Sequence, residues 1–401
     1  MNILVLTSVY KDSSLGNLDG STNVVNSFVH DWVKLGHRVI VIHNSHKYPL
    51  FVHKLPDELK KKLASRMGFG IADYKAICEK QYEDGGAQVW RLPMLKLIPH
   101  KAPAKGVIKR QVDKIKKILT KADFKPDVMT GHWASPQMEI ISELKKQYHC
   151  CTAVVLHGNG YVSSSKFPSK EYLKNIDKLG CRSVAQAKQI KELLNLEELP
   201  FVCYSGVPDA YLRKFKIDTN KFKDIKTWKF IYVGRLVKYK HVETIIRALA
   251  SFIEIDWTLD IVGDGAESDY LKQTAKNCGC IEKVMFHGRV SRNKVMELLK
   301  ETHCFILVSK GEAFGLVYLE AMAASCVAIG SIGEGIDGVI VDGKNGFLCE
   351  PADESALQKK LQTLFRMGTN NVCELVENGY KTAEEFADSK VAEKYLDDLF
   401  S

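Results

Sequence analysis

Short apolar runs alternate with amphipathic segments along the chain, and no other feature constrains the fold as strongly. Residues 2–10 form an apolar run, residues 25–33 carry an apolar stripe at helical spacing, and residues 37–45 form a second apolar run. Two parallel strands need a crossover connection, which is usually a helix. This succession therefore predicts the start of a parallel sheet, and similar runs up to residue 207 extend it.

The same alternation starts again in the second half of the chain. Strand candidates follow at residues 229–236, 257–265 and 303–310, with amphipathic segments between them. We expect an α/β protein with two tandem Rossmann-like, doubly wound parallel-sheet domains that face each other across a cleft. The expected boundaries are 1–208 for the N-terminal domain, 209–228 for a polar linker, 229–380 for the C-terminal domain and 381–401 for a C-terminal helix that packs back toward the first domain.

The length and the charge are consistent with this organisation and suggest a class of partner. A chain of 401 residues exceeds the roughly 150 residues of a typical domain. The net charge of +9 is unevenly spread: ten lysines and arginines between Arg91 and Lys121 face one acid, Asp113, and a second basic cluster lies at residues 60–66. The two clusters, 60–66 and 91–121, favour either an anionic membrane surface or a solvated helix face. We do not expect a nucleic-acid partner, because no stacking aromatic residues are interleaved with the lysines and arginines of these clusters.

The N-terminus and the cysteines predict where the protein resides. The first residues read as a strand and not as a signal peptide, and no apolar run approaches the ~20 residues of a membrane span. The 11 cysteines lack the paired spacing of a zinc site, which favours reduced thiols. We therefore expect a cytoplasmic protein, attached at most peripherally to the inner face of the plasma membrane.

Two loops that follow strands of the second half carry candidate ligand-binding residues. Gly234 ends one strand, and Arg235 and Lys240 follow it as a candidate pyrophosphate clamp. Surface bases after a strand are also common, so this pair alone does not decide. The second loop lies in "KGEAFGLVYLEAMAAS", residues 310–325, which places Glu312 before a turn and Glu320 inside an apolar helix.

The second loop has the layout that a nucleoside diphosphate sugar requires. Gly315 permits a tight turn into the helix and leaves the amides of Phe314, Gly315 and Leu316 available to an anion. Glu312 and Glu320 flank these amides as acceptors of hydrogen bonds from hydroxyl groups. Paired glutamates at this spacing also arise by chance, so the motif becomes specific only with its neighbours.

Together and in order, the motifs make the chain resemble a GT-B retaining glycosyltransferase of family four, the glycosyl transferases group 1. The similarity rests on Gly234-Arg235 with Lys240, on "LDIVGDGAE", "VMFHGRV" and the 310–325 stretch, and on "GEGIDGVIVDGKNGFLCEPAD" at residues 333–353. The resemblance implies that Arg235 and Lys240 hold the donor diphosphate, that Glu312 binds the donor sugar and that Glu320 binds the ribose.

The resemblance also assigns roles outside these two loops. Arg289 and Val290 would lie beside the base, and Gly234 and the Phe314–Leu316 backbone beside the donor. His132, in "TGHWASP", matches a family histidine close to the reacting carbon, with His157 as a weaker second candidate. The loop around Gly16 and Gly20 would pass the diphosphate and admit the acceptor.

These roles imply a hexosyltransferase that uses a UDP- or GDP-linked sugar and a lipid-linked or glycan acceptor in envelope, capsule or exopolysaccharide synthesis. Because no Asp-x-Asp pair occurs in the expected donor loops, we expect no metal cofactor. Two other interpretations stay open: a non-catalytic subunit that binds a nucleotide sugar, and a sugar synthase or phosphorylase that acts on a free sugar or phosphate.

Overall fold

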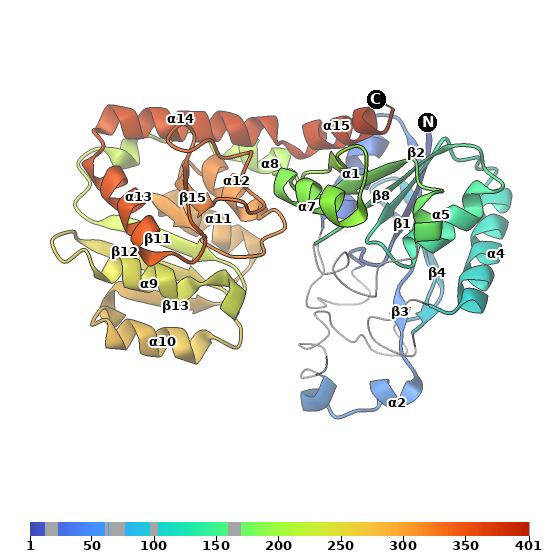
Figure 1. Cartoon of the computed structure of the whole chain (residues 1–401), viewed down its shortest axis with the longest axis horizontal. Coiled ribbons are helices and arrows are strands. Elements are labelled where there is room, and N and C mark those ends of the chain that lie inside the picture. The colour runs from blue at the N-terminus through green and yellow to red at the C-terminus, as the bar shows by residue number, and fades with distance from the viewer. Residues whose placement is uncertain (13–22, 61–62, 64–76, 97–102, 159–169, 401) are drawn as a thin grey trace. The chain divides into compact units, whose positions relative to one another are not determined.

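The computed structural model describes residues 1–12, 23–60, 63, 77–96, 103–158 and 170–400 (Figure 1). These residues divide into two compact units, each with its own sheet. Unit 1 comprises Met1–Arg182, Ala187–Cys203 and Val391–Ser401, and unit 2 comprises Ser183–Gln186 and Tyr204–Lys390.

Unit 1 contains an eight-stranded sheet in the order β10-β9-β8-β7-β1-β2-β5-β4. Its pairs are parallel except for β4 with β5, which is antiparallel. The strands are β1 (Asn2–Thr7), β2 (Arg38–His43), β4 (Lys80–Asp84), β5 (Ala87–Arg91), β7 (Val128–His132), β8 (Cys151–Val155), β9 (Lys178–Cys181) and β10 (Phe201–Val202). A small parallel sheet joins β3 (His46–Lys47) to β6 (Met94–Leu95).

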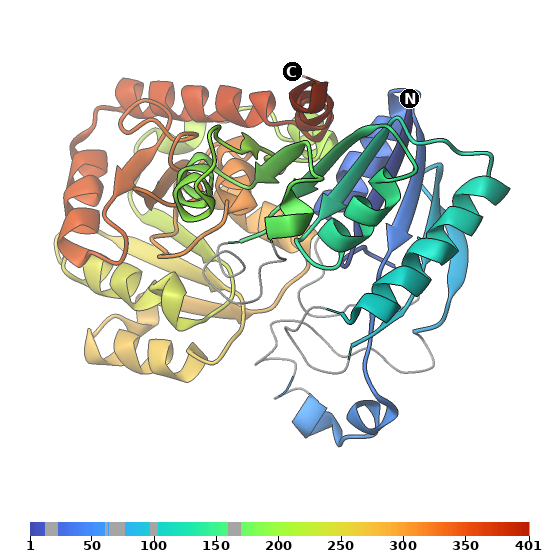
Figure 2. The same cartoon turned by 45° about the vertical axis from the view of Figure 1, so that its right-hand side comes forward.

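The helices of the first half connect these strands as crossovers. They are α1 (Val24–Lys34), α2 (Leu50–His53), α4 (Lys105–Lys121), α5 (Gln137–Lys145), α6 (Lys170–Leu173) and α7 (Val184–Leu194). The apolar stripe of α1 buries Phe28 and Trp32, as its helical spacing predicts. In both views α2 lies at the end of unit 1 opposite the N-terminus (Figures 1 and 2).

Unit 2 contains a six-stranded parallel sheet in the order β13-β12-β11-β14-β15-β16. The strands are β11 (Trp228–Val233), β12 (Trp257–Val262), β13 (Val284–Gly288), β14 (Cys304–Ile306), β15 (Val327–Ser331) and β16 (Phe347–Cys349). The helices are α8 (Asp209–Lys214), α9 (Val242–Ala250), α10 (Ser268–Asn277), α11 (Arg292–Glu301), α12 (Leu316–Ala323), α13 (Glu354–Arg366) and α14 (Thr369–Glu385). Helix α9 packs against α10 and α13, while α12 packs against α11 and α14, so the helices form two groups, as expected when they cover the two faces of a parallel sheet.

The stretch expected to be a linker packs as part of unit 2. Residues 209–228 contain α8 and a 3₁₀ turn, Asn220–Phe222, and they bury Phe215 and Phe222 in the core of this unit. The surrounding residues are mostly polar and therefore suggested a linker, but these two aromatic side chains supply apolar surface to the core. At the other end of the chain, α15 (Asp388–Phe400) belongs to unit 1 from Val391 onward.

Each main sheet has a point where its strand order reverses direction, and ligands of doubly wound sheets bind at such points. In unit 1 this point lies between β1 and β7, where Thr7 pairs with His132. In unit 2 it lies between β11 and β14. The loops after these four strands are therefore where a site is expected in each unit.

Candidate functional site

The loop after β11 presents the candidate clamp. Gly234 follows the strand, and a 3₁₀ turn at Lys238–Lys240 leads into α9. The Tyr232 hydroxyl donates a hydrogen bond to the Arg235 carbonyl at 2.9 Å, which fixes the loop to the strand that precedes it. The exposed Arg235 guanidinium donates to the Tyr239 hydroxyl at 2.8 Å. Arg235 is thus oriented by its own loop and stays accessible to solvent.

The loop after β12 packs tightly against this one, which explains its two glycines. Gly263 has a φ of +143°, and a Cβ atom at this position would come within 1.8 Å of the Gly234 carbonyl oxygen. A Cβ atom at Gly265 would come within 2.2 Å of the Leu236 carbonyl oxygen. Because backbone atoms cannot yield at such distances, the close packing of the loops requires glycine at both positions.

Lys240 and Glu312 meet at the switch point of unit 2. The Lys240 ammonium forms an ion pair with the Glu312 carboxylate, and the two side chains are only 10% and 15% exposed. A hydrogen bond of 2.9 Å from the Lys310 amide to the Tyr239 carbonyl also joins the loops after β14 and β11. The sequence analysis predicted both residues as donor ligands, and the structure brings them into direct contact.

Glu334, in the loop after β15, holds the Glu312 loop in place. Its carboxylate accepts hydrogen bonds from the amides of Gly311 at 2.8 Å and Glu312 at 2.7 Å. The Gly335 amide donates to the Glu312 carbonyl at 3.0 Å. The sequence analysis missed Glu334, although its place in a loop after a strand of the second sheet was an available signal.

The N-terminus of α12 opens from the same loop. Gly315 precedes the helix with a φ of +81°, and none of the side chains that the structure describes caps this terminus. The first turn carries no acidic residue, so its amides and its helix dipole favour an anion. A Cβ atom at Gly335 would lie 2.4 Å from the Phe314 amide nitrogen, so the loop after β15 lies directly on the backbone that precedes α12. The backbone of the predicted Phe314–Leu316 amide site therefore continues from the loop after β14 and packs against the loop after β15.

Glu320, which was expected to be free to bind the ribose, is instead paired with an arginine. It is 7% exposed in α12, and its carboxylate forms an ion pair with Arg292 at the start of α11. The Arg292 guanidinium lies 5.5 Å from the centre of the Tyr211 ring. The sequence analysis missed Arg292, which was signalled only by its position just after the serine cap of α11. A carboxylate inside an apolar helix needs such a partner.

The other residues predicted for unit 2 lie in the loop after β13. Arg289 is exposed, and Val290 packs against the core of unit 2. They precede Arg292 by two or three residues, so the loop that would meet the base leads directly to the partner of Glu320. Gly16 and Gly20 lie outside the described residues.

His132 ends β7 in unit 1 and is completely buried there. Its Nδ1 atom lies 3.0 Å from Nε2 of His157, so one imidazole donates a hydrogen bond to the other. The Phe28 ring stacks on one side of it, and the Tyr395 ring meets it edge-on. Burial, reinforced by the positive charge of Arg182, lowers the pKa of His132 to about 3. This histidine is therefore neutral at physiological pH.

His157 follows β8 and is also neutral. Burial lowers its pKa well below the ordinary value, and the charge of Arg182 adds to this effect. The Trp133 ring stacks on the His157 ring with centres 4.1 Å apart, and Trp133 itself has a φ of +67°. A pair of neutral histidines beside a stacked tryptophan therefore occupies the switch-point edge of unit 1.

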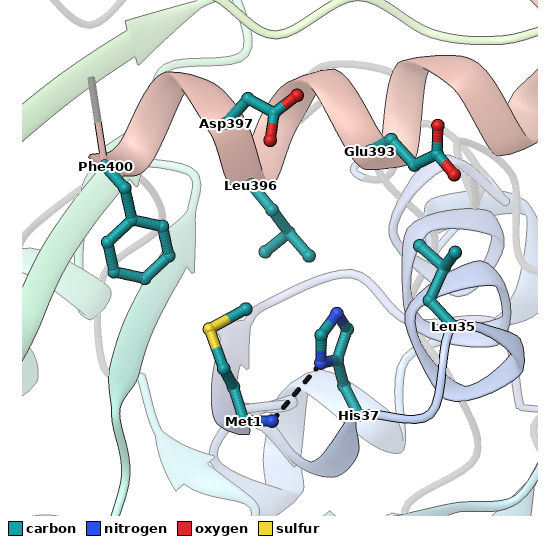
Figure 3. A pocket seen from close by; sticks show the side chains of 7 residues that line it. All are labelled: Met1, Leu35, His37, Glu393, Leu396, Asp397 and Phe400. Atoms are coloured by element: carbon teal, nitrogen blue, oxygen red, sulfur yellow. Dashed lines mark hydrogen bonds between the residues drawn. The ribbon is translucent and has the colours of Figure 1, made fainter.

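A surface pocket in unit 1 lies elsewhere, at the amino edge of the sheet (Figure 3). Met1 and His37, which directly precede β1 and β2, line it together with residues of α15 that include Glu393 and Asp397. None of the predicted site residues that the structure describes lines this pocket. Within the described part of the chain, no group of three or more His, Cys, Asp or Glu residues could hold a metal ion, and no helix is long and apolar enough to cross a membrane.

Comparison with known proteins gives a family for the second half of the chain. Residues 214–382 match the family described as glycosyl transferases group 1. The chain is 38% identical over 128 residues to N-acetyl-alpha-D-glucosaminyl L-malate synthase of Bacillus anthracis. That alignment spans 32% of this chain and 33% of the relative, about a third of each.

Two solved structures resemble the chain over its whole length. One is Anabaena HepE in complex with UDP, with a TM-score of 0.67, 17% identity and 100% of both chains covered. The other is the lipopolysaccharide outer core galactosyltransferase WaaB, with a TM-score of 0.69, 17% identity and coverage of 100% of this chain and 99% of that one. At these identities the similarity establishes the fold, which is that of two Rossmann-like domains.

Proposed function

Because the chain is a glycosyltransferase of the glycosyl transferases group 1 family with the GT-B fold, we propose that it transfers a hexose from a UDP- or GDP-linked donor with retention of configuration and without a metal ion. The acceptor is a lipid-linked or glycan intermediate of envelope, capsule or exopolysaccharide synthesis. The complexes of HepE with UDP and the lipopolysaccharide role of WaaB support this direction.

One observation carries the proposal. Lys240 and Glu312 come from loops after two adjacent strands and meet at the point where the strand order of unit 2 reverses, beside the uncapped N-terminus of α12. This arrangement offers a cation, a carboxylate and free amides within one site. A sugar linked to a diphosphate presents the complementary groups, because its phosphates are anionic and its hydroxyls donate hydrogen bonds.

Each group has a role in the proposed reaction. The bond between the anomeric carbon and the diphosphate oxygen breaks, and Arg235, Lys240 and the α12 amides stabilise the negative charge that develops on the leaving diphosphate. The acceptor oxygen bonds to the same face of the anomeric carbon, and its proton passes to an oxygen of the departing phosphate. Glu312 accepts hydrogen bonds from the sugar and Glu320 from the ribose, and the family resemblance is what assigns His132 to the reacting carbon.

Two alternatives compete with this proposal. A non-catalytic subunit would bind the nucleotide sugar without turning it over. A sugar synthase or phosphorylase would turn it over with a free sugar or phosphate as acceptor. The exposed Arg235, which no buried carboxylate neutralises among the described residues, favours catalysis, because an accessible cation is available to the leaving group.

The test begins with thermal unfolding of the full chain in the presence of a panel of UDP- and GDP-sugars. One sugar nucleotide should raise the unfolding temperature, because a ligand that binds only the folded state stabilises it. That donor is then incubated with lipid-linked acceptors, free sugars and phosphate, and released nucleoside diphosphate is measured. Release that depends on a lipid-linked or glycan acceptor, with an unchanged anomeric configuration, supports the proposal. Binding without release favours the non-catalytic subunit, and release with free sugar or phosphate favours the second alternative.

A further inference from the structure

Unit 1 exposes several large apolar side chains in α2, in the residues after it and in β6. Phe51 is 69% exposed, Leu50 is 47%, Leu59 is 51% and Leu95 is 47% exposed. We call these four residues the apolar tip. Three of them lie within ten residues of one another, and the fourth belongs to β6, which pairs with β3 just before α2. Single exposed apolar residues are ordinary on a protein surface, whereas a cluster of this kind marks an interaction site.

Two buried residues anchor the segment that carries Leu50 and Phe51. Tyr48 is 3% exposed and His53 is 9% exposed, and their ring centres lie 6.3 Å apart. They bracket Leu50 and Phe51, whose side chains stay in solvent. The outward direction of these two side chains is therefore set by the packing of their neighbours, and it is not the consequence of a loose chain end.

Positive charge surrounds the tip and extends along α4. Lys54 is exposed next to it, and Lys47 pairs in register with Leu95. Helix α4 contacts β6, and its outer face carries a row of exposed bases with the single acid Asp113. The exposed bases are Lys105, Lys109, Arg110, Lys117 and Lys121, together with Lys114, which is paired with Glu79 at 2.6 Å. Two acids near the tip, Asp57 and Glu58, reduce this charge, and Asp57 is paired with Lys60 at 3.1 Å.

We propose that the apolar tip inserts into the headgroup region of an anionic lipid bilayer, while the bases of α4 attract the negatively charged surface. Four protruding side chains are too few for a stable protein interface, which buries roughly 800 Å² on each partner. They suffice for a bilayer, where a few apolar groups and nearby bases act together. Helix α2, which carries Leu50 and Phe51, follows β2 and lies beyond its carboxyl end, at the edge of unit 1 that the proposed acceptor would approach.

The experiment measures sedimentation of the full chain with vesicles, without donor or acceptor. The vesicles are of phosphatidylcholine alone or with about a third phosphatidylglycerol. The wild type should bind the anionic vesicles and be released by salt. Phe51→Ser and Leu50→Ser should each weaken this binding about tenfold, because each removes a large apolar group from the bilayer. Ile253→Ser is the matched control, since Ile253 is 86% exposed in unit 2 and should leave binding unchanged.

Other results would overturn the proposal. The proposal is wrong if the wild type fails to bind anionic vesicles at low salt, or if Phe51→Ser binds them as tightly as the control variant does. If Phe51→Ser converts a dimer to a monomer in sedimentation velocity while vesicle binding persists, the tip is an interface between copies of this chain. Because the vesicle assay needs no sugar transfer, its failure would leave the proposed transferase function untouched.

Discussion

The Lys240 ammonium lies against the Glu312 carboxylate, so a cation that follows β11 is held by an acid that follows β14. Both side chains are largely buried. An ion pair is stronger in the protein interior than in water, but burying the two charges costs desolvation free energy. The pair therefore links two strand-end loops in the absence of any ligand. Substitutions at this pair and at its neighbours can separate this structural role from the proposed role in sugar transfer.

Arg235 should affect turnover without affecting folding. We expect Arg235→Ala to lower kcat by about 10²–10³-fold, because a charge that stabilises a transition state contributes roughly 3–4 kcal/mol. The unfolding temperature should stay unchanged, since the side chain is exposed and its hydrogen bond to a described residue stays within its own loop. Steady-state kinetics and calorimetry check both points. Lys238→Ala, which removes another exposed base of this loop, should retain activity.

Lys240 should affect both folding and turnover. Lys240→Met leaves the Glu312 carboxylate without its cation at a site that is mostly buried. We expect the free energy of unfolding of unit 2 to fall by about 3 kcal/mol, the usual cost of breaking a buried pair from one side. The double variant Lys240→Met/Glu312→Gln should recover part of this loss but none of the activity. A urea double-mutant cycle measures the coupling, and equal stability of the single and double variants would contradict the assignment.

Arg292 should control how well Glu320 binds a ribose. The carboxylate is paired with Arg292 through one oxygen, which restricts its orientation, and its second oxygen is the one proposed to contact the ribose. We expect Glu320→Gln to abolish the preference for a nucleoside diphosphate over its 2′-deoxy analogue, and Arg292→Met to weaken this preference about tenfold. Titration calorimetry with both nucleotides checks this. Lys294→Met, on the outer face of α11, is the control, and an undiminished preference in Arg292→Met would exclude the positioning role.

The sequence predicted the fold and the residues at the strand ends, because both follow from local patterns. Alternating strands and helices gave two parallel sheets, and a loop after a strand places Lys240 or Glu312 at the carboxyl edge. The ion-pair partner of Glu320 could not be predicted in this way. It depends on which helix lies alongside α12, and Arg292 is 28 residues away in sequence.

The burial of His132 was hidden for the same reason. Its position after β7 was evident, but Tyr395, which covers its ring, comes from the far end of the chain. Phe215 and Phe222 were placed in a linker because the surrounding residues are polar, whereas the core of unit 2 takes up both rings. Long-range packing therefore limits what local patterns reveal about these residues, whereas the position of Glu334 after a strand was a local signal.

His303 should make the stability of unit 2 depend on pH. It precedes β14 and is 8% exposed. Its Nδ1 atom accepts a hydrogen bond from the Lys229 amide at 2.9 Å, and its Nε2 atom donates one to the Lys221 carbonyl at 3.0 Å. The first of these bonds needs the neutral ring, because a proton on Nδ1 would face the Lys229 N–H group. Burial, with the charge of Lys221, lowers the pKa of His303 from 6.5 to about 4.

The sign of the effect follows from comparing the two states. Between pH 6.5 and about 4, the unfolded chain binds a proton at His303 and the folded unit does not, so stability falls as the pH is lowered through this range. Above pH 6.5 His303 is neutral in both states, so its contribution to the free energy of unfolding is fully present. We expect His303→Gln, which keeps a donor and an acceptor without titrating, to reduce the slope of unfolding free energy against pH by about one proton. Denaturant unfolding at several pH values measures this slope, and equal slopes in the two proteins below pH 6.5 would refute the prediction.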